Sequence, residues 1–251
     1  MRIRILDTSK LLGLEAAQAA AKIINETVAA KGEARIALST GASQFETLAA
    51  LAKEDVDWTK VTMFHLDEYV GLPETHPASF RKYLKERFVS LVKLKRVFFV
   101  DGEGDVAAKI AVLNREIESA PIDLGVIGIG ENGHIAFNDP PARFDAMESY
   151  RIVELNDACK KQQVGEGWFA GVKDVPATAV SMSCYRIMMC RKIISSVPHA
   201  QKAQAIKRTF EGGISDMVPA TLLKFHPDWS LFLDRDSASK LGANIAAFMD
   251  R

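Results

Sequence analysis

The chain has 251 residues, of which 48% are hydrophobic and 25% charged, and its 32 basic and 32 acidic side chains cancel at neutral pH. This composition is typical of an ordinary globular protein, and it excludes both an acidic solvating tail and a basic nucleic-acid surface spread over the whole molecule. A chain of this length forms one large α/β domain or two small ones. Any anionic ligand must therefore be held by local geometry.

Cysteine usage and apolar runs indicate a cytoplasmic protein. Cys159, Cys184 and Cys190 form neither a C-x-x-C motif nor a His-paired zinc spacing, and their odd number argues against a disulfide framework. The N-terminal residues lack a long apolar segment, and no run of about 18 uncharged apolar residues follows. We expect neither a membrane nor a nucleic-acid partner.

Strands and helices are predicted to alternate along the chain. Short apolar or β-branched runs predict strands at residues 3–6, 36–39, 61–66, 97–100, 124–129, 179–182, 193–197 and 230–233. Segments of helical period predict helices at residues 11–30, 43–53, 78–92, 106–119, 200–210, 220–225 and 237–249. This order predicts an α/β fold, a single-domain Rossmann-like sheet, mostly parallel, with helices on both faces.

Two irregular segments interrupt the alternation, at residues 128–144 and 158–176. The loops at the carboxyl ends of parallel strands form the ligand crevice of such a sheet. Both segments are candidates for it. We expect residues 1–251 to form one domain, with a lid-like insertion near residues 158–176.

The first candidate site is the segment Ile36-Ala-Leu-Ser-Thr-Gly-Ala-Ser-Gln-Phe, which runs from a strand into a helix. Thr40, Gly41, Ala42 and Ser43 would present backbone N–H groups and hydroxyls at a helix N-terminus, which favours an anion such as phosphate. The segment lacks the Gly-Lys-Ser/Thr of a Walker A loop. The alternative is a plain turn in which Ser43 caps its own helix.

The second candidate is Met63-Phe-His-Leu-Asp-Glu-Tyr-Val-Gly-Leu-Pro, in which a strand ends in Asp67 and Glu68. Consecutive strand residues point to opposite faces, so the two carboxylates should have different roles. One would face the crevice as a general base, and the other would hold the loop or a neighbour. The alternative is a pair of ordinary loop acids.

The third candidate, residues 123–141, contains a Gly-x-Gly-x-x-Gly pattern, but Asn138-Asp-Pro-Pro follows too soon for the long helix of a dinucleotide site. We therefore reject that interpretation. A buried strand instead turns sharply and exposes Asn132, His134, Asn138 and Asp139. An imidazole beside an amide and a carboxylate is suited to proton transfer, although an isolated histidine is more often structural.

The fourth candidate is Lys202, in the first turn of the helix predicted at residues 200–210. It lies four residues before Ile206, on the stripe that faces inward. A lysine there opposes the helix dipole and favours a bound anion beside it. The alternative is that its chain extends to solvent.

Together these segments resemble the glucosamine-6-phosphate deaminase/isomerase family, which is related more distantly to 6-phosphogluconolactonases. The resemblance covers most of the chain and rests on Ser39-Thr-Gly-Ala-Ser, Phe64-His-Leu-Asp-Glu-Tyr-Val-Gly-Leu, Gly128-x-Gly-x-Asn-Gly-His-Ile-Ala-Phe-Asn-Asp-Pro and Gln201-Lys-Ala. Lactonases typically continue Gly-His-x-Ala-Ser-Leu-Phe-Pro, which this chain does not.

The resemblance implies a reaction and a site. Asp67 would remove the C2 proton of the opened amino sugar, and His134, supported by Asn132 and Asp139, would assist opening of the ring. The phosphate of the substrate would lie against Thr40, Gly41, Ala42 and Ser43, with Lys202 as its cation. Glucosamine 6-phosphate and water would give fructose 6-phosphate and ammonia, with no metal and no redox cofactor.

The chain departs from the family pattern at three points. Asn132 stands where well-known members have Asp, and Asp139 replaces the usual Glu and is one methylene shorter. The lid region lacks the phosphate-binding Arg of family members, and Lys160, Lys161 or Gln162 is a candidate substitute. The pattern of the allosterically activated members is not evident.

Two other functions stay open at this stage, a 6-phosphogluconolactonase and a non-catalytic sugar-phosphate sensor. A lactonase needs no C2 base, and regulators that sense sugar phosphates carry a DNA-binding segment for which this chain has neither spare length nor a basic cluster. The epimer of the substrate is undetermined. We also predict that the chain can assemble into a homo-oligomer, whose size the sequence does not indicate.

Overall fold

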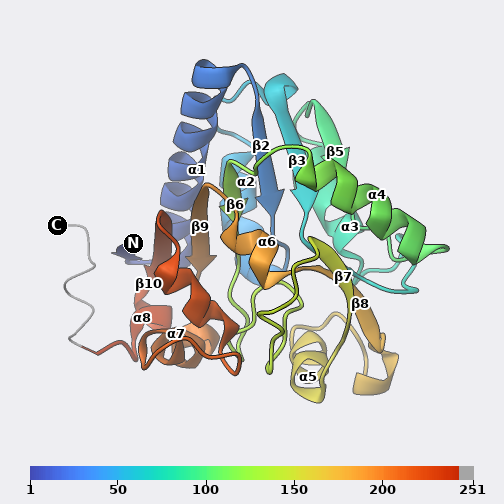
Figure 1. Ribbon diagram of the computed structural model, residues 1–251. Coiled ribbons are helices and arrows are strands. Elements are labelled where there is room, and N and C mark those ends of the chain that lie inside the picture. The colour runs from blue at the N-terminus through green and yellow to red at the C-terminus, as the bar shows by residue number, and fades with distance from the viewer. Residues whose placement is uncertain (243–251) are drawn as a thin grey trace.

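The computed structural model describes residues 1–242. Seven parallel strands form the central sheet, in the order β1-β10-β9-β6-β2-β3-β5 (Figure 1). The strands are β1 (Arg2–Leu6), β2 (Ala34–Leu38), β3 (Val61–His65), β5 (Arg96–Phe98), β6 (Leu124–Val126), β9 (Lys192–Val197) and β10 (Trp229–Asp234). The predicted α/β fold with a mostly parallel sheet is confirmed.

Helices cover both faces of this sheet, because alternate strand residues carry apolar side chains to opposite sides. The helices are α1 (Ser9–Lys31), α2 (Phe45–Leu51), α3 (Phe80–Leu84), α4 (Val106–Glu118), α5 (Asp157–Gly165), α6 (Cys184–Met188), α7 (Ala203–Phe210) and α8 (Arg235–Ala238). In Figure 1, α1 and α2 lie on one face and α4 and α6 on the other.

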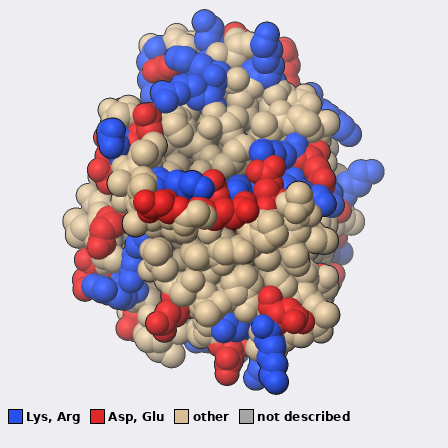
Figure 2. All heavy atoms as spheres, turned by 90° about the vertical axis from the view of Figure 1, so that its right-hand side faces the viewer, with Lys and Arg blue, Asp and Glu red and all other residues tan. Residues whose placement is uncertain are grey.

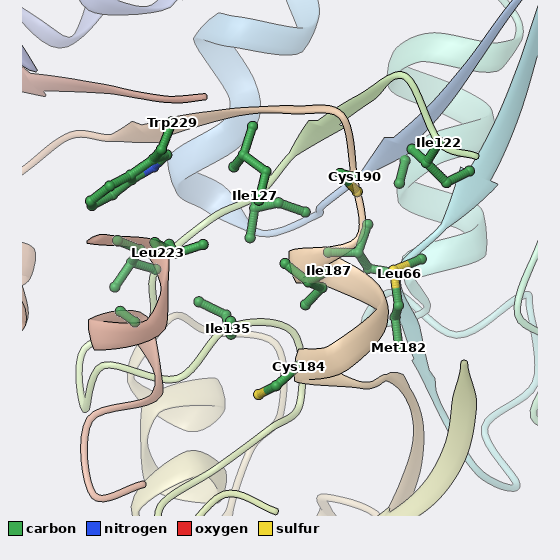
Figure 3. Close-up of a cluster of buried hydrophobic side chains, with 14 of the residues drawn as sticks. Leu66, Ile122, Ile127, Ile135, Met182, Cys184, Ile187, Cys190, Leu223 and Trp229 are labelled. Carbon is green, nitrogen blue, oxygen red and sulfur yellow. The ribbon is translucent and has the colours of Figure 1, made fainter. Parts of the chain in front are cut away.

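Each face has its own apolar core. On one side, α1 contributes Leu12, Ala16, Ala20 and Ile24, whose four-residue spacing places them on one stripe of the helix. On the other side, a larger cluster joins the sheet to α4, α6 and the segment Pro219–Phe225. Figure 3 shows part of this second cluster, with Ile127 between Trp229 and Ile187.

A second, antiparallel sheet lies beyond the carboxyl ends of the central strands. It has the order β4-β8-β7, with β4 at Asp67–Tyr69, β7 at Tyr150–Glu154 and β8 at Thr178–Met182. Helix α5 stands beside it at the lower right of Figure 1. A third apolar cluster, which includes Tyr69, Phe80, Phe137 and Phe169, joins this sheet to residues 158–176.

The structure differs from the predicted elements in several places. The strand predicted at residues 179–182 forms, but in the small sheet, and β4, β7, α5 and α6 were not predicted. The helix predicted at residues 78–92 becomes α3 followed by a π-helical turn, Lys85–Val89. Of the helix predicted at residues 237–249, residues 243–249 lie outside the described part of the chain.

Basic and acidic side chains alternate in a band across the face in Figure 2. This mixture agrees with the equal numbers of the two charges in the sequence. Within residues 1–242, the helices are all too short or too polar to cross a lipid bilayer.

The loop after β5 presses against β4 at Gly102. A Cβ atom at this position would lie 2.0 Å from the Tyr69 carbonyl oxygen, a contact with backbone that a small side-chain movement cannot relieve. We predict that Gly102→Ala lowers the free energy of unfolding by about 1–3 kcal/mol or more, because the loop or β4 must shift.

Gly213 provides the matched control, because a Cβ atom there would meet no other atom within 4 Å. We expect Gly213→Ala to change the unfolding free energy by less than about 1 kcal/mol. Urea unfolding of both variants checks this pair, and equal stabilities would contradict the contact at Gly102.

Candidate active site

The four predicted segments meet in one cavity at the carboxyl ends of β2, β3 and β6. We call it the inner cavity; it is lined by Ser39, Thr40, Gly41, Ser43, Asp67, Phe80, Gly128, Ile129, Gly130, His134, Ala136, Phe137, Gln162, Gln163, Glu166 and Lys202. Parallel strands place their following loops at the same edge of the sheet, which is why segments far apart in sequence converge here.

Asp67 lies in the inner cavity and is only 6% exposed. Burial, and to a smaller extent the charge of Glu68, raise the pKa of this carboxyl to about 8, although the hydrogen bond from the backbone N–H of Phe137 opposes the shift. The carboxyl group is therefore poised near neutral pH, where an efficient general base has its pKa.

Glu68 points away from Asp67, as the alternation of strand residues predicts. Its carboxylate accepts hydrogen bonds from the Ser79 hydroxyl and the Arg81 backbone N–H, both at 2.8 Å, and from two further backbone N–H groups. Arg81, itself buried, also pairs with Asp101 and Glu103, at 2.7 Å each. Glu68 therefore anchors the loop that follows Asp67 to α3.

His134 faces the inner cavity from the turn after β6. Its Nδ1 atom lies 3.1 Å from Asp139 Oδ1, and the Asn132 side chain donates to the same oxygen at 3.0 Å. Burial opposes ionisation of Asp139, but the contacts with His134 and Asn132 outweigh it, so the pKa of this carboxyl lies below its usual value. A carboxylate at Nδ1 favours the tautomer that leaves Nε2 as the proton acceptor.

Asn132 and Asp139 thus stand behind His134 and not in the inner cavity. Asn132 lines a neighbouring hollow, and its Oδ1 accepts from the His134 backbone N–H at 2.9 Å. Asp139 opens only toward another surface depression. Both residues can orient the imidazole, but neither lines the cavity where a substrate would bind.

Gly130 explains the glycine pattern that resembled a dinucleotide motif. A Cβ atom at Gly130 would lie 2.2 Å from the Nε2 atom of His134, so the ring packs directly on this backbone. No helix begins in the turn; the next one in the chain is α5 at Asp157–Gly165. The glycine makes room for the imidazole and not for a pyrophosphate.

The predicted phosphate segment forms a tight turn in the wall of the inner cavity. Thr40, Gly41 and Ser43 line this cavity, whereas Ala42 lines the neighbouring hollow. A 3₁₀ turn, Ala42–Gln44, precedes α2, so the predicted helix begins later and is shorter than residues 43–53. The Ser39 hydroxyl accepts from the Gly128 N–H at 3.1 Å and joins this turn to the one that carries His134.

Lys202 enters the cavity from the 3₁₀ turn Ala200–Lys202, which leads into α7, and it lines both the inner cavity and the neighbouring hollow together with Ser43. The side chain is only 7% exposed, so it does not extend into solvent. Burial lowers the pKa of its ammonium group, and the charges of Glu166 and Glu131 oppose that shift. An anion beside Lys202 would compensate its burial.

The segment predicted to act as a lid, residues 158–176, is more regular than expected, because residues 157–165 form α5. Asn156 caps this helix by accepting from the Cys159 N–H at 2.9 Å. Of the three candidate substitutes for the lid arginine, Gln162 lines the inner cavity and Lys161 only the neighbouring hollow.

Sequence reasoning missed three cavity residues on the lid side. Gln163 accepts a hydrogen bond from the Tyr69 hydroxyl at 2.8 Å, Phe137 packs against Tyr69, and Glu166 faces Lys202. The Gln-Gln and Gly-Glu-Gly-Trp patterns of this region were visible, but without a recognised helix nothing indicated which side chains point inward.

The chain matches known proteins along most of its length. The sequence profile described as glucosamine-6-phosphate isomerases/6-phosphogluconolactonase matches residues 7–230. A glucosamine-6-phosphate deaminase of Listeria welshimeri is 37% identical over 238 residues, which cover 94% of this chain and 99% of that protein. The deaminase of Halothermothrix orenii is 36% identical over 235 residues, which cover 90% of this chain and 96% of that protein.

Solved structures agree with the sequence matches. A monomeric glucosamine-6-phosphate deaminase of the NagB superfamily superposes with a TM-score of 0.87 at 28% identity, over 96% of this chain and 100% of that one. The 6-phosphogluconolactonase of Trypanosoma brucei has a TM-score of 0.78 at 18% identity, over 96% and 98% of the two chains, and shows a shared fold only. The chain therefore belongs to the glucosamine-6-phosphate isomerase/6-phosphogluconolactonase family.

Proposed function

We propose that this protein is a glucosamine-6-phosphate deaminase, which converts glucosamine 6-phosphate and water into fructose 6-phosphate and ammonia. The observation that carries the proposal is the inner cavity, which Asp67 and His134 share with Lys202 and the turn at Thr40–Ser43. The relatives at 36–37% identity bear the same name.

The first step is opening of the sugar ring. A proton must move between the anomeric hydroxyl and the ring oxygen, and one imidazole nitrogen can mediate this transfer. His134 has its Nδ1 beside Asp139 and its Nε2 on the side of Gly130, a cavity-lining residue. Asn132 and Asp139 act as positioning residues for this ring.

The second step is removal of the C2 proton by the Asp67 carboxylate, which gives an enolamine. The proton returns from the carboxyl group to C1 and leaves a ketimine, and water then adds at C2 and releases ammonia. Asp67 can take and return this proton because its raised pKa makes both forms accessible near neutral pH. A lactonase reaction needs no base at C2, so it would not use the Asp67 carboxyl in this way.

The phosphate supplies binding energy at the other end of the cavity. We propose that it lies against Thr40, Gly41, Ala42 and Ser43, with Lys202 as its cation. Good positioning of C2 at the base can contribute about 7–11 kcal/mol to lowering the barrier. Gln162 is the proposed substitute for the lid arginine, since its side chain lines the inner cavity.

We also propose that residues 158–176 act as a lid on a single domain, because α5 carries the lining residues Gln162 and Gln163, and the lining residue Glu166 directly follows this helix. The three cysteines are unpaired within residues 1–242, which supports the expectation of a reducing, cytoplasmic environment. Assembly into a homo-oligomer stays a prediction.

The direct test is turnover of purified protein with glucosamine 6-phosphate. We expect ammonia and fructose 6-phosphate in equal amounts, and loss of both products by at least about 100-fold in Asp67→Asn, because general-base catalysis typically contributes that much. Hydrolysis of 6-phosphogluconolactone that survives this substitution, without ammonia from the amino sugar, would instead identify a lactonase.

The raised pKa of Asp67 predicts a specific pH dependence. The base must be ionised, and its pKa in the free protein is about 8, so kcat/KM should rise with pH from about 6 and level off above about 8. Steady-state rates across this range check the prediction. If kcat/KM instead levels off near pH 5, the pKa of Asp67 is not raised by burial and the prediction is wrong.

Lys202 and Lys161 form a matched pair for the phosphate site, because Lys202 lines the inner cavity and Lys161 only the hollow beside it. We predict that Lys202→Ala raises KM about 10-fold to 100-fold, as expected for the loss of one charge-assisted hydrogen bond. Lys161→Ala should change KM less than about 3-fold. Equal effects of the two substitutions would contradict the proposed place of the phosphate.

A further inference from the structure

A second carboxylate, Glu166, lies in the inner cavity and has no part in the reaction proposed above. It directly follows α5, and its backbone N–H continues the helix by donating to the Gln162 carbonyl at 2.9 Å. The side chain is half-buried and lies on the lid side of the cavity.

Two neighbours fix the direction of the Glu166 carboxylate. The Gln162 side-chain amide donates to Oε1 at 2.7 Å, and the Trp168 indole N–H donates to Oε2 at 3.0 Å. A carboxylate oxygen can accept two hydrogen bonds, and each oxygen of Glu166 accepts one from these neighbours. Both oxygens can therefore accept a hydrogen bond from a further donor. The carboxylate is therefore oriented, and it can still bind a hydroxyl group.

The position of Glu166 is unfavourable for phosphate binding alone. Its negative charge faces Lys202, the proposed cation of the phosphate, and so would repel a bound phosphate. Glu131 also faces Lys202, but it lines only the neighbouring hollow. A carboxylate held by two hydrogen bonds inside the substrate cavity requires a favourable contact that offsets this repulsion.

The proposed orientation of the substrate indicates what that contact is. With C2 at Asp67, the ring oxygen at His134 and the C6 phosphate at Lys202, the hydroxyl groups on C3 and C4 are left for the remaining wall. Glu166 lies toward the proposed phosphate end, because it lines both the inner cavity and the neighbouring hollow together with Ser43 and Lys202. C4 is nearer to that end than C3.

We infer that Glu166 accepts a hydrogen bond from the C4 hydroxyl of the amino-sugar phosphate and thereby reads the configuration of that carbon. This inference rests on the proposed function and adds the residue that distinguishes 4-epimers. Glucosamine 6-phosphate and galactosamine 6-phosphate differ only at C4. A site built to bind a hydroxyl discriminates strongly against a substrate that leaves its polar group unpaired.

The test compares Glu166→Gln with Glu131→Gln, since each removes one negative charge that faces Lys202. For each variant, kcat/KM is measured with both epimers, and the affinity for inorganic phosphate is measured by calorimetry. We expect Glu166→Gln to lower kcat/KM at least about 10-fold for the preferred epimer only, so that the ratio between epimers falls toward one. Its affinity for inorganic phosphate should not fall.

Glu131→Gln should leave the ratio between the epimers unchanged. If both variants only strengthen phosphate binding and keep that ratio, Glu166 acts through its charge alone and the inference is wrong. Glu166→Asp, which keeps the charge but shortens the side chain, provides a second variant. It should also reduce the discrimination, and an unchanged ratio in this variant would overturn the inference.

A failure of the proposed function is recognised separately. If the unaltered protein releases no ammonia from either epimer, the deaminase assignment fails, whatever Glu166 does. Calorimetry with the two amino-sugar phosphates then still compares their affinities. A preference that disappears in Glu166→Gln supports the C4 contact, and a preference that persists contradicts it.

Discussion

The burial of Asp67 without a compensating cation is the constraint on which the proposed chemistry depends. The folded protein holds this carboxyl at a pKa of about 8, above its ordinary value of 3.8, because water is excluded and Glu68 lies next to it. Between those two pH values the folded state keeps a proton that the unfolded chain has lost, so the free energy of unfolding falls as pH rises. The free energy of unfolding at neutral pH is therefore lower than it would be with a neutral side chain at this position. The same raised pKa makes Asp67 suited to proton abstraction.

The rest of the structure keeps that base in place. Glu68 accepts from the Ser79 hydroxyl and from two backbone N–H groups at the start of α3, and it also accepts from the Tyr69 N–H and contacts the buried guanidinium of Arg81. The hydrogen bond between Ser39 and Gly128 joins the turn at the phosphate end to the turn that carries His134. Because both turns continue strands of one sheet, the fold sets the distance between the proposed phosphate site and His134.

The fold and the site differ in how much the sequence alone could predict. Local patterns predicted the parallel sheet, since each buried strand such as Val61–His65 is a short apolar run. The motifs were expected at one crevice, and part of each lines the inner cavity, whereas Asn132 and Asp139 lie outside it. Asp67 and His134 do share a cavity with Thr40, Gly41, Ser43 and Lys202. Their assigned roles are still proposals.

The missed features depend on contacts that the local sequence does not contain. The small sheet forms because Asp67–Tyr69 pairs with Thr178–Met182, more than a hundred residues later, so β4 is too short to predict by itself. Asp139 was expected to support His134, and only the folded turn shows that it lies behind the ring, 3.1 Å from Nδ1. Glu166 was not singled out because its partners Gln162 and Trp168 reveal an oriented carboxylate only once α5 is in place.

The central claim is that one sugar phosphate spans Asp67, His134 and Lys202 at the same time. A crystal structure with an open-chain amino-sugar phosphate that cannot react, such as the 1-alcohol of glucosamine 6-phosphate, tests it most directly. The account predicts the phosphate at Lys202 and C2 within about 3–3.5 Å of the Asp67 carboxylate. A ligand whose phosphate lies at Lys202 while C2 points away from Asp67 would contradict it.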